Sequence, residues 1–187
     1  VAGAVEIEPG VSQKLAEQRR AAVGNLCYDL KFRIPASRKE KVTGSAVIKF
    51  TYKKCGDDLQ LDFQGADGQY GGVVTVNGKK RRAEWRSEHI ILKESWLKNG
   101  ENAVDVAFTS GDKSLNRNED YLYTLFVPDH ARSVFPCFDQ PDLKALFKLK
   151  LDVPDGWETV SSVTDQLLPP YLFSFVAGKF TVTQAEP

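Results

Sequence analysis

Several residue types are scarce in this chain of 187 residues, which has no methionine, two histidines and three cysteines. Neither His89 nor His130 stands in H-E-x-x-H, the helical pair that binds zinc with a glutamate as base. Cys27, Cys55 and Cys137 are odd in number, and their spacings match no zinc pattern. Buried free thiols are the favoured interpretation, and one disulfide with one free thiol is the alternative. Cysteine usage therefore leaves the compartment open.

Net charge and long apolar runs are missing too. Twenty-five basic side chains balance twenty-five acidic ones, which argues against a nucleic-acid surface built on net charge. No apolar run approaches the roughly 20 residues that cross a bilayer, so we expect no membrane span. No signal peptide is visible, and the chain starts without methionine. We therefore expect a piece of a longer protein, and the missing start leans toward an exported one, periplasmic or in the cell envelope.

The residues that are present indicate a soluble globular chain, with 42% hydrophobic and 27% charged residues. A domain of this size buries roughly 70% of the surface that its unfolded chain exposes, so it needs no disulfide or metal ion to stabilise it. Apolar residues at helical spacing predict a helix over residues 11–26, with Gly24 and Asn25 at its end. The sequence thus divides into an N-terminal extension with a helix, residues 1–25, and a main domain, residues 26–187.

Beyond the helix, apolar and polar residues alternate with the period of a strand. Asn77-Gly78 is a strong hairpin signal, 93–97 is expected to form a helical turn, and 112–120 is expected to be a loop. Eight or so short strands without intervening helices predict an all-β sandwich of mainly antiparallel sheets. The expected strands cover residues 26–34, 46–53, 59–64, 73–76, 82–85, 103–108, 147–153 and 171–180.

Motifs that carry chemistry elsewhere have a plainer interpretation here. His89 lies in strand-like sequence and is expected to be a partly exposed strand residue. His130 follows Asp129, but no serine or cysteine sits in a nucleophile-elbow context, so a catalytic dyad is disfavoured. The glycines of 65–72 lack the Lys-Ser/Thr of a phosphate loop, which favours a hairpin or bulged loop. The basic run 79–82 follows the Asn-Gly turn and is expected to be a solvated hairpin tip, with an anion contact as the alternative.

The densest segment runs from Arg132 to Pro141, where Pro136 and Pro141 bracket an irregular corner. Arginine suits a partly buried ion pair, and carboxylates beside proline turns often cap backbone N–H groups. Arg132 and Asp139 are therefore expected to be structural. From the residues alone, the chain is a β-sandwich with one unusual corner and no catalytic set.

This corner resembles a family signature. Ala131-Arg132, Phe135 to Pro141 and Lys144-Ala145-x-Phe147 are similar to A-R-x-x-F-P-C-F-D-E-P-x-x-K-A-x-F, with Gln140 in place of the glutamate. That pattern belongs to the N-terminal domain of the aminopeptidase N family of zinc metallopeptidases, the gluzincins that include leukotriene A4 hydrolase. Trp157, Tyr171-Leu172-Phe173 and Val176-Ala177-Gly178-x-Phe180 support the resemblance over about residues 26–183. The signature residues are Arg132, Phe135, Pro136, Cys137, Phe138, Asp139, Pro141 and Lys144.

The resemblance implies a saddle-like, antiparallel or mixed β-sandwich that precedes a zinc-dependent catalytic domain in a parent aminopeptidase. The G-x-M-E-N and H-E-x-x-H motifs of that later domain are absent here. We therefore expect no catalytic residue, metal or cofactor in this chain, and zinc in the parent. The expected partners are the downstream catalytic domain of the same chain and a peptide substrate. The alternative is a free-standing β-sandwich interaction module without a peptidase domain.

The resemblance also locates a candidate substrate-binding loop, formed by Leu125, Phe126, Val127, Pro128 and Asp129. The family usually places a glutamine or glutamate here that holds the free amine of the substrate, at the positions of Val127 and Leu125. Neither residue offers a side-chain acceptor, so backbone carbonyls or Asp129 would have to substitute. The stretch from Trp157 to Tyr171 is also shorter than usual, which indicates either a shortened hairpin or residues missing near 161–168.

Overall fold

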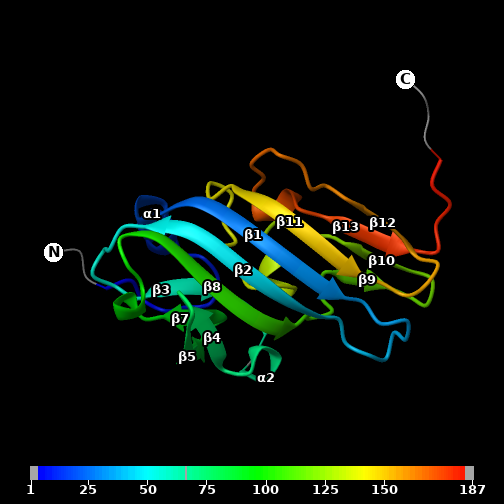
Figure 1. Cartoon of the computed structure of the whole chain (residues 1–187). Helices are drawn as coiled ribbons and strands as arrows, with labels where there is room; N and C mark the ends of the chain where they lie inside the picture. The colour runs from blue at the N-terminus through cyan, green and yellow to red at the C-terminus, as the bar shows by residue number, and fades with distance from the viewer. Residues whose placement is uncertain (1–3, 66, 184–187) are drawn as a thin grey trace.

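The computed structural model describes residues 4–65 and 67–183. They form three sheets and a short helix, α1 (Gln13–Ala22), with a single further α-helical turn, α2 (Asp67–Tyr70). The largest sheet has the order β11-β1-β2-β8-β4-β5, the second β12-β13-β10-β9 and the third β3-β7-β6. Figure 1 shows the large sheet in front, with β3 and β7 at one end and β10, β12 and β13 at the other. The strands are β1 (Val23–Arg33), β2 (Thr43–Tyr52), β3 (Leu59–Asp62), β4 (Val73–Val76), β5 (Lys79–Arg82), β6 (Glu84–Arg86), β7 (His89–Leu92), β8 (Gly100–Thr109), β9 (Leu115–Arg117), β10 (Tyr121–Thr124), β11 (Ala145–Asp152), β12 (Glu158–Ser161) and β13 (Phe175–Gly178).

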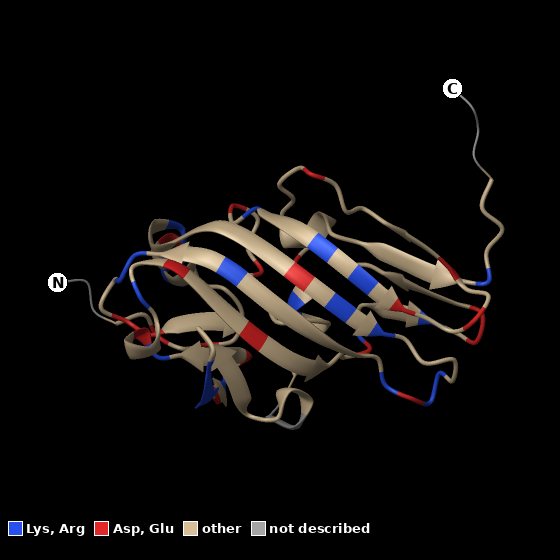
Figure 2. Cartoon of the chain, in the orientation of Figure 1, with Lys and Arg blue, Asp and Glu red and all other residues tan. Residues whose placement is uncertain are grey.

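The large sheet is mixed, because β1 pairs in parallel with β11 and antiparallel with β2. Alternate residues of β1 are buried, among them Tyr28 and Phe32. Phe32 lies 5.0 Å from Phe175 of the second sheet, measured between ring centroids, and 6.3 Å from Phe135. The opposite face of the large sheet carries bands of charged residues (Figure 2). One face therefore packs on the two smaller sheets and the other faces water, which confirms the all-β sandwich expected from the sequence.

Helix α1 is shorter at both ends than the predicted 11–26. It begins after Ser12, whose hydroxyl accepts a hydrogen bond from Leu15 N, and it ends at Ala22 because Val23 is already extended. Gly24 and Asn25 do not end the helix. They lie at an irregularity in the pairing of β1 with β2, where Asn25 has a φ of 49°.

The turn predictions had mixed outcomes. The Asn77-Gly78 hairpin is confirmed, with positive φ at both residues between β4 and β5. The helical turn expected at 93–97 is present as a 3₁₀ turn over Glu94–Trp96. The loop prediction for 112–120 is wrong at β9, which pairs with β10 through the backbone. The expectation of a hairpin or bulged loop at 65–72 is wrong at α2.

One strand, β12, lies between Trp157 and Tyr171, and it pairs with β13 along its whole length. The chain then returns past the start of β11, where Leu168 and Ala145 exchange two backbone hydrogen bonds of 2.9 Å. Residues 158–178 thus form a hairpin whose connection closes against the sandwich. Within the residues described, no helix is long and apolar enough to cross a membrane.

Candidate functional site

The predicted loop continues β10 and keeps the alternation of that strand. Leu125 and Val127 are 57% and 52% exposed, whereas Phe126 between them is buried. The ring of Phe126 lies 5.9 Å from that of Phe135 and 6.1 Å from that of Phe173. Burial of this one ring fixes the loop to the core, so two apolar side chains project outward on either side of it.

Asp129 at the end of the loop is half-buried and already engaged. Its Oδ2 accepts a hydrogen bond of 2.6 Å from Arg132 Nη2, and its Oδ1 lies 3.8 Å from His130 Nδ1. His130 in turn donates its backbone N–H to Phe126 O at 2.8 Å. The only carboxylate of the loop is therefore held by its own neighbours.

Asp139 holds the other side of the same turn. Its Oδ2 accepts a hydrogen bond of 3.0 Å from Arg132 N, and Arg132 O accepts one of 2.9 Å from Gln64 N. Burial raises the pKa of Asp139 to about 6, with a further upward push from the charge of Asp62. The backbone of Arg132 is thus fixed on both sides, which sets the path of the chain that leaves the loop.

Cys137 and Phe138 join the corner to two sheets. Cys137 exchanges backbone hydrogen bonds of 3.0 and 2.9 Å with Asp62 of β3, and Phe138 N donates to Tyr28 Oη of β1 at 2.9 Å. Burial raises the pKa of the Cys137 thiol, and also that of the Tyr28 hydroxyl, well above their usual values. This thiol is therefore held in its unreactive, protonated form.

The remaining signature residues differ in exposure. Pro136 is buried in the corner beside Phe135, whereas Pro141 and Lys144 are exposed. Gln140, which replaces the usual glutamate, is buried and donates from Nε2 to Ala16 O in α1 at 3.2 Å.

Below the corner lies a buried ionic cluster that no sequence pattern indicates, formed by Arg19, Asp62 and His89. Arg19 makes a two-pronged ion pair with Asp62, in which Nη1 lies 2.9 Å from Oδ2. Its Nε and Nη2 also donate to Gln60 O, and its guanidinium lies 5.4 Å from the ring centroid of Phe138. Although burial alone would raise it, Arg19 and His89 lower the pKa of Asp62 to about 2.

The expectation that His89 is partly exposed is wrong. Its ring is fully buried, with Nδ1 2.8 Å from Asp62 Oδ1 and Nε2 2.9 Å from Glu8 O. The N-terminal segment covers this end of β7, and alternation within a strand cannot reveal cover from elsewhere in the chain. Asp62 Oδ2 also accepts from Asp139 N at 2.8 Å, so the ionic cluster and the signature corner are one network.

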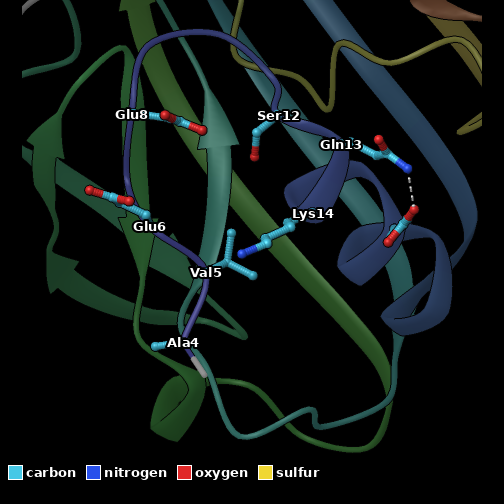
Figure 3. Close-up of a pocket in the computed structure, with 8 residues that line it drawn as sticks. Ala4, Val5, Glu6, Glu8, Ser12, Gln13 and Lys14 are labelled. Carbon is cyan, nitrogen blue, oxygen red and sulfur yellow. Dashed lines mark hydrogen bonds between the residues drawn. The ribbon is translucent and has the colours of Figure 1, made fainter. Parts of the chain in front are cut away.

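A groove lies between the N-terminal segment and the start of α1 (Figure 3). It is lined by Ala4, Val5, Glu6, Glu8, Ser12, Gln13, Lys14 and Glu17. Its side chains are mostly solvated, and a hydrogen bond of 2.8 Å joins Gln13 to Glu17 along the helix. Helix α1 and strand β10 lie at opposite ends of the molecule in Figure 1, so this groove does not extend the predicted loop.

Among residues 4–65 and 67–183, no three histidine, cysteine, aspartate or glutamate side chains gather as metal ligands. The three cysteines do not pair with one another, and Cys137 is buried while Cys55 is exposed. The fold and the corner define a β-sandwich domain in which the corner is a buried structural junction between β1 and β3. Its exposed loop presents apolar side chains and backbone groups.

Comparison with known proteins identifies the family of this β-sandwich domain. The chain belongs to the peptidase M1 N-terminal domain family, whose model matches residues 25–166. Aminopeptidase N of Streptomyces lividans is 42% identical over 65 residues, which are 32% of this chain and 8% of that protein. A probable aminopeptidase 1 of Sulfurisphaera tokodaii is 30% identical over 122 residues, which are 62% of this chain and 15% of that protein.

Solved structures show the same fold. Yeast LTA4 hydrolase matches with a TM-score of 0.70 and 20% identity, over 95% of this chain and 34% of that one. An M1 zinc metallopeptidase from Deinococcus radiodurans matches with a TM-score of 0.64 and 19% identity, over 84% of this chain and 42% of that one. The chain therefore spans less than half the length of these relatives.

Proposed function

We propose that this chain is the non-catalytic N-terminal domain of a zinc-dependent metalloaminopeptidase, which removes N-terminal residues from peptides. The observation that carries the proposal is the family match, together with the signature corner from Arg132 to Lys144, which departs from the family pattern at Gln140. The relatives named aminopeptidase contain this region within chains that are far longer than this one. In such a parent, zinc would be held by the catalytic domain and would supply the activated water.

The role of the loop follows from its exposure. Leu125 and Val127 would form part of the wall of the active-site cleft, because both project from a backbone fixed by Phe126. Asp129 is bound to Arg132, so its carboxylate is a poor candidate to hold the amine of the substrate. Backbone carbonyls of the loop are the acceptors that we propose for this amine. We expect the affinity gained there to be modest, since a neutral carbonyl replaces the usual amide or carboxylate side chain.

The experiment is a comparison of this 187-residue chain with the parent enzyme that carries it. Hydrolysis of leucine and alanine p-nitroanilides and zinc content are measured on both. We expect activity and stoichiometric zinc in the parent, and neither in the chain alone. Peptidase activity in the chain alone, or a parent without zinc and activity, would overturn the proposal. The second result would favour a free-standing interaction module instead.

A further inference from the structure

The exposed large apolar side chains of the described residues are concentrated in two segments of the chain. Of eleven such side chains, nine lie in segments 121–127 and 160–182, and the other two are Val73 and Leu146. The nine are Tyr121, Tyr123, Leu125, Val127, Val160, Leu167, Leu172, Phe180 and Val182. Apolar groups gathered in this way on a folded domain indicate a surface that is covered by something else.

The pairing of strands shows that several of these side chains share one face. Tyr123 of β10 is opposite Val176 of β13, which is opposite Val160 of β12. Directly opposed residues in antiparallel strands point to the same side of a sheet. Tyr123, Val176 and Val160 thus form a row across three strands, on the side of the second sheet that faces away from the core. We call this side the outer face.

Two further aromatic rings, Tyr121 of β10 and Phe180 beyond β13, extend this row from Tyr123. The ring of Tyr121 stacks on Tyr123 at 6.2 Å and on Phe180 at 6.4 Å, with interplanar angles of 26° and 27°. Gly178 lies beneath this stack, where an added Cβ would come within 2.8 Å of both Tyr121 and Phe180. A glycine at this position lets the rings close over the strand, so the outer face is an ordered aromatic surface.

The outer face has a polar rim. At one end Lys179 and Asp120 form an exposed ion pair of 2.8 Å, and at the other end the chain reaches Asp129 with its Arg132 partner. An apolar, aromatic centre with a charged rim is the usual composition of a protein interface. The outer side of the large sheet, by contrast, carries bands of charged residues (Figure 2), as expected for a face exposed to water.

We propose that the outer face, made of Tyr121, Tyr123, Val160, Val176 and Phe180, is the surface on which the catalytic domain of the parent enzyme packs. This inference rests on the proposed function and specifies the partner's position. Two observations favour that occupant over a second copy of this chain. Tyr121 and Tyr123 continue directly into Leu125 and Val127, so one partner would cover both the face and the cleft loop. The structural relatives also carry more than half of their length outside this domain.

Hydroxyl-radical footprinting tests the proposal, with oxidation rates of single side chains measured by mass spectrometry. The rates in the isolated chain are compared with those in the intact parent. We expect Tyr121, Tyr123 and Phe180 to be protected at least about fivefold in the parent, since interface cores are packed as tightly as protein interiors. Leu146, which is similarly exposed on the large sheet, is the internal control and should keep its rate.

A matched pair of variants makes the test specific. In the parent, Tyr123→Lys should raise the oxidation of Phe180 toward its rate in the isolated chain, because a charge on the outer face opposes packing. Leu146→Lys should leave that rate unchanged. Equal effects of the two variants would overturn the proposal.

The outcomes separate this inference from the proposed function. Rings that react equally in the parent and in the isolated chain, while Leu125 and Val127 are protected, would overturn the docking surface but leave the proposed function standing. Protection that grows with the concentration of the isolated chain would overturn it in favour of a second copy. The proposed function itself fails only on the activity and zinc measurements.

Discussion

Replacement of Arg19 by methionine tests the buried ionic cluster most sharply. The variant keeps a long apolar side chain but removes the guanidinium that pairs with Asp62 and donates to Gln60 O. Both partners in the ion pair are fully buried, and removal of one member of such a pair costs about 3–5 kcal/mol. For a chain of this length that cost corresponds to a fall in Tm of roughly 6–20 °C.

The stability lost in Arg19→Met should depend on pH, and the protonation of Asp62 sets the direction of that dependence. In the native protein the pKa of Asp62 is about 2, below its unfolded value, so its contribution is present at neutral pH and is lost as the pH falls through 2. Without Arg19, burial raises that pKa instead, and Asp62 takes up a proton in mild acid. The difference in unfolding free energy between native protein and variant should therefore be largest at pH 7 and less than half as large at pH 4.

The assay is urea unfolding followed by tryptophan fluorescence at both pH values. Arg20→Met is the matched control, because Arg20 is the next residue of α1 and its side chain is 76% exposed. We expect this control to change stability by less than about 0.5 kcal/mol. Addition of Asp62→Asn to Arg19→Met should recover at least about 1 kcal/mol, since it removes the unpaired buried charge. An Arg19→Met cost as small as that of the control, or one that does not change with pH, would show that the buried ion pair does not stabilise the fold in this way.

Three further predictions concern the corner, the outer face and the loop. The pKa of Asp139 is raised to about 6, so stability should fall as the pH rises from 4 to 6, and Asp139→Asn should abolish that fall in urea titrations. Gly178→Ala should lower the unfolding free energy by about 1–3 kcal/mol in the same titrations, because its Cβ would lie 2.8 Å from Asp120 O. Val127→Gln in the parent should lower KM for peptides at unchanged kcat, and an unchanged KM would argue against the loop contacting the substrate's amine.

The sheet architecture was largely predictable, because alternation along single strands is a local signal. Burial of Tyr28 and Phe32 and the hairpin at Asn77-Gly78 depend on residues next to them in the sequence. The predicted range of helix α1 is too long, because apolar Val23 fits either a helix face or a strand. Pairing with β2 places Val23 in strand β1. The sequence does not predict the short strand β9, because three residues between polar neighbours are too few to show the period of a strand.

The site was predictable only where a motif existed. The signature located the corner, but its hydrogen bonds to Tyr28 and Asp62 join residues that lie far apart in the sequence. Arg19 stands among charged residues of an amphipathic helix and is indistinguishable there from exposed Arg20. Its burial depends on three-dimensional proximity to β3 and β7, as does that of His89. The division into residues 1–25 and 26–187 remains a prediction, although this cluster ties α1 firmly to the sandwich.

The proposed function requires the loop around Val127 to face the substrate in a parent aminopeptidase. A photo-crosslinking residue, p-benzoylphenylalanine, is placed at position 127 of the intact parent, and a peptide-like inhibitor is added. Position 73 is the control, because Val73 is also exposed but lies on β4 of the large sheet. We expect a crosslink to the inhibitor from position 127 and none from position 73. No crosslink from 127, or equal yields from the two positions, would contradict it.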